Sequence, residues 1–290
     1  MPDIAYIKAQ KRADKRLIHA SNILSKNNTY SAPSPKRTIL LSIAQRYHAY
    51  LQSNLALTGY SEQVIRQRVE LLNDYYNYIH DCGWDNAFDS RGKFRSTILE
   101  EFIYILFKDL VHDLTAALPP ASAQKIGSGS VKAYLNLFIS ARNFVDFASS
   151  PNISKNEKNQ DFAIYRQIDM SVGATSLKMN IPCVAIEAKT YIDKTMLDTV
   201  IATAEKLKEG NPYTKFIAVS ETYAVAMEVD PAYSRIDSIY VLRKTATSSG
   251  VWNQIDANLV VELFNEVHSH IISPWSDVAT KLAQGKIISR

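Results

Sequence analysis

The sequence predicts an α/β fold in which a mixed central sheet is flanked by helices and follows an N-terminal helical region. Three observations support this prediction. Apolar residues recur at helical spacing through residues 1–85, whereas short apolar runs alternate with amphipathic segments after them. A chain of 290 residues that is 46% hydrophobic can also bury one large core or two smaller ones. We therefore predict a helical region over residues 1–90 and an α/β domain over residues 91–290.

Two long helices are predicted in the N-terminal region. The first begins at Ser34, which precedes a proline at the first helical position, and it ends at Gly59. The second begins near Ser61, carries an apolar stripe and ends at Gly83. The tyrosines of both helices fit packing residues better than platforms for stacked bases.

The elements of the α/β domain follow in the order helix, three strands, helix, two strands, helix. The predicted ranges are 97–107 (helix), 134–139, 162–170 and 182–190 (strands), 195–210 (helix), 215–219 and 236–242 (strands), and 258–272 (helix). We expect a capping box at Thr195 and Asp198 to start the helix 195–210, and Gly210 to end it. This order is typical of a mixed sheet with helices on its faces.

A Glu-x-Lys pair, Glu187 and Lys189, lies at the polar end of the strand 182–190. Residues i and i+2 of a strand share one face, so the two charges point the same way. A carboxylate can hold Mg²⁺ and a lysine can position or deprotonate water, but Mg²⁺ usually takes a second carboxylate. Asp161 opens the preceding strand and supplies one. In the alternative interpretation Glu187 and Lys189 form only an ion pair at a strand end.

The choice between Asp161 and Asp169 depends on how the strands 162–170 and 182–190 pair. If they form an antiparallel hairpin, Asp161 beside Glu187 centres the turn near Ala174 and leaves residues 173, 175 and 176 in the turn, which suits their types. Asp169 in that place would force a glycine into the ladder. We therefore expect Asp161 to be the first metal ligand, provided that no bulge or longer loop changes the register.

These residues resemble a known family. Residues 161–164 (DFAI) and 184–196 (VAIEAKTYIDKTM) are similar to the core of the PD-(D/E)XK nucleases, and more narrowly to type II restriction endonucleases of the BbvCI kind. The string 187–196 is the specific part. No proline precedes Asp161, a position that varies across the superfamily. The resemblance spans roughly residues 93–245 and implies that residues 91–290 form a nuclease domain with a restriction-endonuclease-like core.

The resemblance implies Mg²⁺-dependent hydrolysis of double-stranded DNA at a specific sequence. Asp161 and Glu187 would hold the metal together with the backbone carbonyl of Ala188, and Lys189 would orient and activate the attacking water. Lys194 would reach a backbone phosphate. One such site cuts one strand, so a homodimer or a heterodimer with a related nuclease subunit is expected.

Two adjacent acids, Glu100 and Glu101, interrupt the apolar helix 97–107. Ile98, Glu101 and Ile105 fall on one face, so Glu101 is expected to lie against the sheet. In the family that the chain resembles, a glutamate of this helix often reaches the metal through water. The alternative is that both acids flank the buried stripe and reach solvent.

The net charge of +4 is unevenly distributed. Residues 1–50 hold nine Lys and Arg against Asp3 and Asp14, a net of +7, which leaves −3 for the remainder. Such a segment favours a polyanion, so we expect residues 1–90 to recognise DNA. A solvated basic surface without a ligand is the alternative.

A cytoplasmic location is expected. No apolar run approaches the ~18 residues of a membrane span, and the N-terminus lacks the apolar core of a signal peptide. Cys82 and Cys183, the two cysteines of the chain, fit reduced, inert thiols. No P-loop motif is present, so ATP-driven cleavage is not expected. Two other functions stay open: a repair or junction-resolving nuclease of the same fold, and a catalytically silent DNA-binding or specificity subunit.

Overall fold

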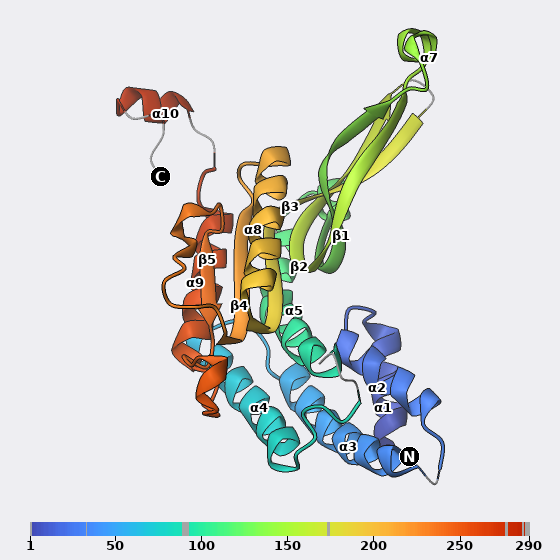
Figure 1. The fold of residues 1–290 in the computed structure, drawn as a ribbon, viewed down its shortest axis with the longest axis vertical. Coiled ribbons are helices and arrows are strands. Elements are labelled where there is room, and N and C mark those ends of the chain that lie inside the picture. The colour runs from blue at the N-terminus through green and yellow to red at the C-terminus, as the bar shows by residue number, and fades with distance from the viewer. Residues whose placement is uncertain are drawn as a thin grey trace.

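A mixed five-stranded sheet lies at the centre of the computed structural model, as the sequence predicts (Figure 1). The structure describes residues 2–32, 34–88, 93–172, 175–275, 278–285 and 287. The strands are β1 (Ile126–Ser140), β2 (Asn152–Val172), β3 (Thr175–Ile192), β4 (Lys215–Tyr223) and β5 (Ser238–Val241). They lie in the order β1-β2-β3-β4-β5; the pairs β1–β2 and β2–β3 are antiparallel, whereas β3–β4 and β4–β5 are parallel.

Helices lie on both faces of this sheet and form a separate group at one end of it (Figure 1). They are α1 (Pro2–Ala13), α2 (Ile18–Thr29), α3 (Pro35–Ala56), α4 (Glu62–Asp81), α5 (Lys93–Ala116), α6 (Pro120–Ala123), α7 (Phe144–Ser149), α8 (Lys194–Gly210), α9 (Ala257–Ile272) and α10 (Val278–Ala283), with short 3-10 turns at Pro231–Tyr233 and Thr247–Ser249. Ile186 and Ala188 of β3 pack in the core that contains α5 and α9, whereas Ala185 packs in the core under α8. Both faces of the sheet are therefore covered, which explains the apolar run in β3.

The N-terminal region is helical, as predicted, but it has two more helices, α1 and α2, before the two long ones. Ser61 starts α4, and its hydroxyl accepts the backbone N–H of Val64 at 3.4 Å. Buried residues of α1–α4 belong to the same hydrophobic cluster as those of α5 and α9. The predicted boundary between residues 90 and 91 lies outside the described residues, and the two-domain division stays a prediction.

Strands β1, β2 and β3 extend into an arm that projects from the body and ends at α7 (Figure 1). The prediction that β2 begins near residue 162 is wrong, since it begins at Asn152. The polar residues 154–160 pair with β1 in this arm. Helix α8 packs against β1 at Ala133 and Leu135, but the outer part of the arm has no helix on its faces (Figure 1), so no alternation of apolar residues marks this part of β2 in the sequence.

Strand β2 is bent where it leaves the arm. Gly129 pairs with Ala163 and Val131 pairs with Gln160, so two residues of β2, Asp161 and Phe162, stand opposite one residue of β1. This is a β-bulge, which bends a strand and redirects its side chains. The φ of Gly129 is +116°, a conformation that glycine tolerates.

The predicted turn between β2 and β3 differs in detail. Val172 pairs with Thr175 and Ser171 with Ser176, so Thr175 and Ser176 belong to the ladder rather than to the turn. Residues 173 and 174 lie outside the described residues. The pairing therefore extends closer to the turn than predicted, and a register shift between Ile164 and Tyr165 moves the partners beyond it by one residue.

Helix α8 begins one residue earlier than predicted and ends at Gly210 as predicted. Its cap is Asp193, whose carboxylate accepts the backbone N–H of Met196 at 2.7 Å, so the prediction of a capping box at Thr195 is wrong. A side chain at Gly210 would not fit, because its Cβ would lie 2.2 Å from the carbonyl oxygen of Leu135 in β1.

None of the described helices is long and apolar enough to cross a membrane. Cys82 and Cys183 are free thiols, in line with the prediction. Burial raises the pKa of Cys183 to about 11, which keeps this thiol protonated and unreactive at neutral pH.

Candidate active site

The candidate site lies where β2 and β3 separate. The two strands are paired from Val172–Thr175 as far as Phe162–Ile186. Beyond that point β2 pairs with β1, and β3 pairs with β4. Asp161 and Glu187 are the next residues on either side of this fork, and the bulge in β2 directs Asp161 toward β3.

The three predicted catalytic residues meet at this fork. The ammonium of Lys189 lies 3.1 Å from Oδ2 of Asp161 and 2.8 Å from Oε2 of Glu187. The backbone N–H of Ala188 donates to Oδ2 of Asp161 at 2.9 Å, which holds this carboxylate against β3. Asp169 lies farther along β2, where it pairs with Lys125 at 3.3 Å. The predicted placement of Asp161, rather than Asp169, beside Glu187 is therefore confirmed.

The charges of the site are strongly coupled. Burial, and then repulsion from Asp161, raises the pKa of Glu187, while Lys189 acts in the opposite direction. Burial alone would lower the pKa of Lys189, but the charges of Asp161 and Glu187 outweigh it and raise the pKa above its ordinary value. Lys189 is therefore an ammonium ion at neutral pH. Its positive charge lies between the carboxylates of Asp161 and Glu187 and stabilises both of them.

This donor set fits a magnesium ion. Mg²⁺ prefers oxygen ligands and commonly binds through one or two carboxylates together with water and phosphate oxygens. Asp161 and Glu187 supply two carboxylates that face the same cation. Within the described ranges, no group of three or more His, Cys, Asp or Glu could hold a metal, so backbone oxygen, water and substrate would have to supply the remaining ligands.

Glu101 does not lie at this site, and the prediction that it faces the sheet is wrong. Its side chain, with a relative exposure of 1%, accepts the backbone N–H groups of His19 and Ala20 at 2.8 and 3.2 Å and the hydroxyl of Tyr47 at 2.5 Å. Glu101 thus joins α5 to the first turn of α2. The alternative, that Glu101 reaches solvent, is wrong as well.

Glu100 is the acid of α5 on which the charges of the candidate site act. Burial, and then the negative charge of Asp161, raises its pKa to about 7, while Lys189 acts in the opposite direction. The residue-type pattern could not identify it, because α5 is buried on two sides, by the sheet and by the N-terminal helices. The pair of adjacent acids is the signal that the sequence does contain. Adjacent residues of a helix point in different directions, so two neighbouring acids contact different parts of the structure.

The buried position of Glu101 predicts a pH-dependent stability. Burial raises its pKa to about 7 from an ordinary value of 4.5, although its hydrogen bonds act in the opposite direction. Between these two values the unfolded chain has lost the proton that the folded chain retains, so the contribution of Glu101 to stability falls as pH rises. The slope is about 1.4 kcal/mol per pH unit at most. We expect Glu101→Gln to remove this contribution and so to make the pH dependence of stability shallower in urea denaturation measured from pH 5 to pH 7.5, while the slope that the raised pKa of Glu100 contributes remains.

A hollow of about 300 Å³ opens beside the site, between β2, β3 and α8. Lys158 and Asn159 of β2 line it, together with Glu187 and Lys189. A second hollow of about 600 Å³ shares Lys158 and Asn159 and continues along the arm past two more lysines, Lys132 and Lys155. A surface with three lysines therefore leads from the candidate site onto the arm, and one of them, Lys155, pairs with Glu157 at 2.7 Å. Lys194 is exposed at the start of α8, where it pairs with Asp198 at 2.7 Å.

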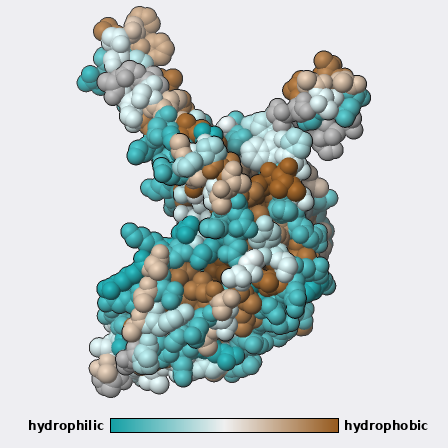
Figure 2. Space-filling view, turned by 180° about the vertical axis from the view of Figure 1, so that it is seen from behind, coloured by the Kyte–Doolittle hydropathy of each residue, from teal (hydrophilic) through white to brown (hydrophobic). Residues whose placement is uncertain are grey.

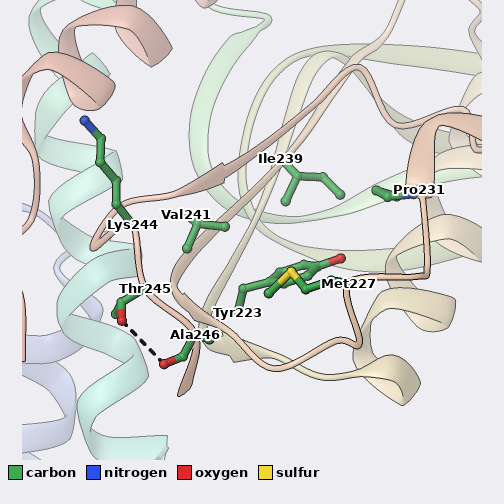
Figure 3. A pocket seen from close by; sticks show the side chains of 8 residues that line it. All are labelled: Tyr223, Met227, Pro231, Ile239, Val241, Lys244, Thr245 and Ala246. Carbon is green, nitrogen blue, oxygen red and sulfur yellow. Dashed lines mark hydrogen bonds between the residues drawn. The ribbon is translucent and has the colours of Figure 1, made fainter. Parts of the chain in front are cut away.

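Another hollow, of about 370 Å³, lies at the ends of β4 and β5 and is mostly apolar (Figure 3). Tyr223, Met227 and Ile239 line it, and Lys244 is the charged residue among its eight lining residues. Because none of these eight is a carboxylate, this hollow has no ligand set for a magnesium ion. It is not a candidate for the catalytic centre.

The model of the Bpu10I restriction endonuclease family matches residues 91–260, more than half of the chain. The chain belongs to the Bpu10I restriction endonuclease family. The matched range contains Glu100, Asp161, Glu187 and Lys189, so the whole candidate site lies in the segment that defines the family. Membership places the chain among restriction endonucleases.

A solved structure supports the same fold for this family member. The structure described as the native BbvCI A2B2 tetramer at low resolution has a TM-score of 0.68 to this chain, with 19% sequence identity, over 89% of this chain and 96% of that chain. The predicted restriction-endonuclease-like core is therefore confirmed, and the likeness extends into the N-terminal helices. A search of curated proteins found no significant match.

Proposed function

We propose that this chain is a type II restriction endonuclease, or one subunit of such an enzyme, that hydrolyses double-stranded DNA at a specific sequence with Mg²⁺. The observation that carries the proposal is the convergence of Asp161, Glu187 and Lys189 at the fork between β2 and β3. Two carboxylates and an ammonium ion in one half-buried space suit the attack of water on a phosphodiester.

Each residue of the site has a proposed role. Asp161 and Glu187 would hold Mg²⁺ with the carbonyl of Ala188, and bound Mg²⁺ would offset the charge that develops on the phosphate and the leaving oxygen. Lys189, as an ammonium ion, would donate hydrogen bonds to the attacking water and to a phosphate oxygen. Glu100 replaces Glu101 in our proposal as the acid of α5 that contacts water at the site.

The proposed role of Glu100 predicts a moderate loss of activity. We expect Glu100→Gln to slow cleavage by roughly 10–100-fold, the usual effect of removing a group that orients a metal's direct ligands. Glu101→Gln, one position along the same helix, is the matched control and should change stability rather than the cleavage rate. Single-turnover rates on a supercoiled plasmid test both variants, and equal rates for the two would contradict the assignment of Glu100.

We propose that residues 1–90 and the basic surface of the arm bind the DNA backbone. Some cations of the N-terminal region already have partners: Arg16 pairs with Asp14 at 2.9 Å and lies over the ring of Tyr104. Arg12 and Lys15 are exposed and suit phosphate contacts. Lys194 is proposed to reach a phosphate next to the site.

Neutralising these exposed cations should make DNA binding less sensitive to salt. We expect Arg12→Gln combined with Lys15→Gln to flatten the slope of log affinity against log salt by up to about 1.8, or about 0.9 for each phosphate contact. The matched control is Lys206→Gln with Arg235→Gln, two other exposed cations. If Arg12→Gln combined with Lys15→Gln kept the wild-type slope, as the control should, Arg12 and Lys15 would face solvent and contact no phosphate.

We also propose that the chain works as a dimer, with itself or with a related subunit, because one site cuts one strand. The BbvCI structure is described as an A2B2 tetramer, which supports an assembly of related subunits. The cytoplasm is the proposed location of the enzyme.

Plasmid cleavage with Mg²⁺ tests the proposed function against its alternatives. Discrete fragments would support a restriction endonuclease. Progressive degradation, or cutting confined to branched DNA, would favour a repair or junction-resolving nuclease. Binding without cutting, alone and with candidate partner subunits, would favour a silent specificity subunit.

A further inference from the structure

Asn159 of β2 is an exposed residue that lines both hollows beside the candidate site. It comes two residues before Asp161, so about 7 Å of strand separates them at roughly 3.3 Å per residue. Its side-chain amide has no hydrogen-bond partner among the residues that the structure describes. A free donor and a free acceptor therefore lie next to the place where a phosphodiester would be cut.

The free amide distinguishes Asn159 from the other asparagines of residues 126–192, since each of those has a hydrogen bond to its side chain. They are Asn136 and Asn156, which bond to each other at 2.7 Å, Asn143, which accepts the backbone N–H of Asp146 at 2.9 Å, Asn152, which donates to Ser140 at 3.4 Å, and Asn180, which donates to the carbonyl of Lys132 at 3.1 Å. These five amides stabilise the strands and turns of the arm, whereas the amide of Asn159 contributes no such contact.

The backbone of Asn159 is fixed although its side chain is free. Asn159 pairs with Lys132 of β1. The side-chain amide of Gln160, which is fully buried, donates to the carbonyl of Asn159 at 3.1 Å. A polar group on a backbone that is already ordered loses less entropy when it binds than the same group on a mobile loop. The position of Asn159 therefore suits recognition of a ligand.

Lys158, the preceding residue, indicates where a phosphate would lie. Its ammonium donates to the hydroxyl of Thr203, a buried residue of α8. Lys158 pairs with Ala133, which packs under α8, and it lines the same hollow as Glu187 and Lys189. No acid pairs with Lys158 in the described part of the chain. A fixed cation without a counter-ion suits a backbone phosphate of DNA, which would bring a base next to Asn159.

We propose that Asn159 determines part of the sequence specificity by binding an adenine in the major groove, within about two base pairs of the cut at about 3.4 Å each. This inference rests on the proposed function and names a residue that reads a base. The amide donates and accepts side by side, which matches N7 and the N6 amino group of adenine; no other base offers this pair in the major groove. Figure 2 shows the arm standing out from the body, so a double helix can reach the side chains of β2 along it.

Selection from a randomised DNA duplex tests the proposal with the full chain in Ca²⁺, which is expected to support binding without cleavage. The wild type should enrich a sequence with an adenine at one position that Asn159→Ala no longer distinguishes, while the other positions stay enriched. Asn159→Asp should shift the preference there toward cytosine, because a carboxylate accepts from the N4 amino group of cytosine. The matched control is Asn156→Ala, which removes an amide that already donates to Asn136 and should keep the adenine.

Replacement of that adenine by 7-deazaadenine identifies the contacted atom, because the analogue lacks the N7 acceptor. The wild type should bind the altered duplex at least about fivefold more weakly, since a good bidentate contact contributes roughly 5–150-fold in discrimination. Asn159→Ala should bind both duplexes equally.

Two results would overturn the role of Asn159: an Asn159→Ala variant that still selects the adenine, and a wild-type chain that selects no sequence. Selection by a chain that does not cut a plasmid in Mg²⁺ would contradict the proposed nuclease function and leave this test intact. Cleavage at a sequence that Asn159→Ala still selects would contradict only the role of Asn159.

Discussion

Replacing Lys189 by alanine is expected to lower the rate of DNA cleavage by about a thousandfold or more. The ammonium ion lies between the carboxylates of Asp161 and Glu187 and is the group placed to donate to the attacking water. Charge stabilisation of this kind contributes several kcal/mol to a transition state, and about 4 kcal/mol corresponds to a factor of a thousand. Single-turnover cleavage of a plasmid with Mg²⁺ measures the effect, and Glu187→Ala should cause a loss of similar size.

Binding separates a catalytic effect from a structural one. With Ca²⁺, which has the charge of Mg²⁺ without its compact octahedral geometry, both variants should bind specific DNA nearly as tightly as the wild type. Lys206→Ala, at an exposed position of α8, is the control for loss of a lysine. If either Lys189→Ala or Glu187→Ala cut DNA at close to the wild-type rate, the assignment of the site would have to be abandoned.

Asp161→Asn is expected to abolish cleavage, whereas Asp169→Asn should have little effect. Asparagine keeps an oxygen that can accept the backbone N–H of Ala188, so the fork between the strands is preserved while the charge that would hold Mg²⁺ is lost. We expect a loss of about a thousandfold for Asp161→Asn, on the same reasoning as for Lys189. Asp169 pairs with Lys125 on the arm side of β2, where its loss removes only a half-exposed ion pair.

The two aspartate variants are each other's control, because they change the same group on the same strand. Thermal unfolding of both should stay close to that of the wild type. An active Asp161→Asn enzyme beside an inactive Asp169→Asn enzyme would reverse the choice of metal ligand and would require a different pairing of β2 with β3.

The placement of the candidate catalytic residues could be predicted from the sequence because short-range rules determine it. Glu187 and Lys189 share a face since side chains alternate along a strand. The pairing of Asp161 with Glu187 follows from a hairpin whose turn prefers small and polar residues. Even a bulge and a turn tighter than predicted left Asp161 beside Glu187, because the register shift lies between Asp161 and the turn. The resemblance to the family rests on the same segment, and the family model matches a range that contains it.

The roles of Glu100 and Glu101, the length of β2 and the arm depended on the tertiary structure. Helix α5 is buried on two sides, so its apolar pattern cannot show which acid faces the sheet. Residues 154–160 form a strand through hydrogen bonds to β1, without the buried face that produces a readable alternation. Local periodicity therefore determined the strand that carries the candidate site and the charges at its end. Contacts between distant segments decided which groups surround those charges, because hydrophobic spacing shows that a face is buried and not what it is buried against.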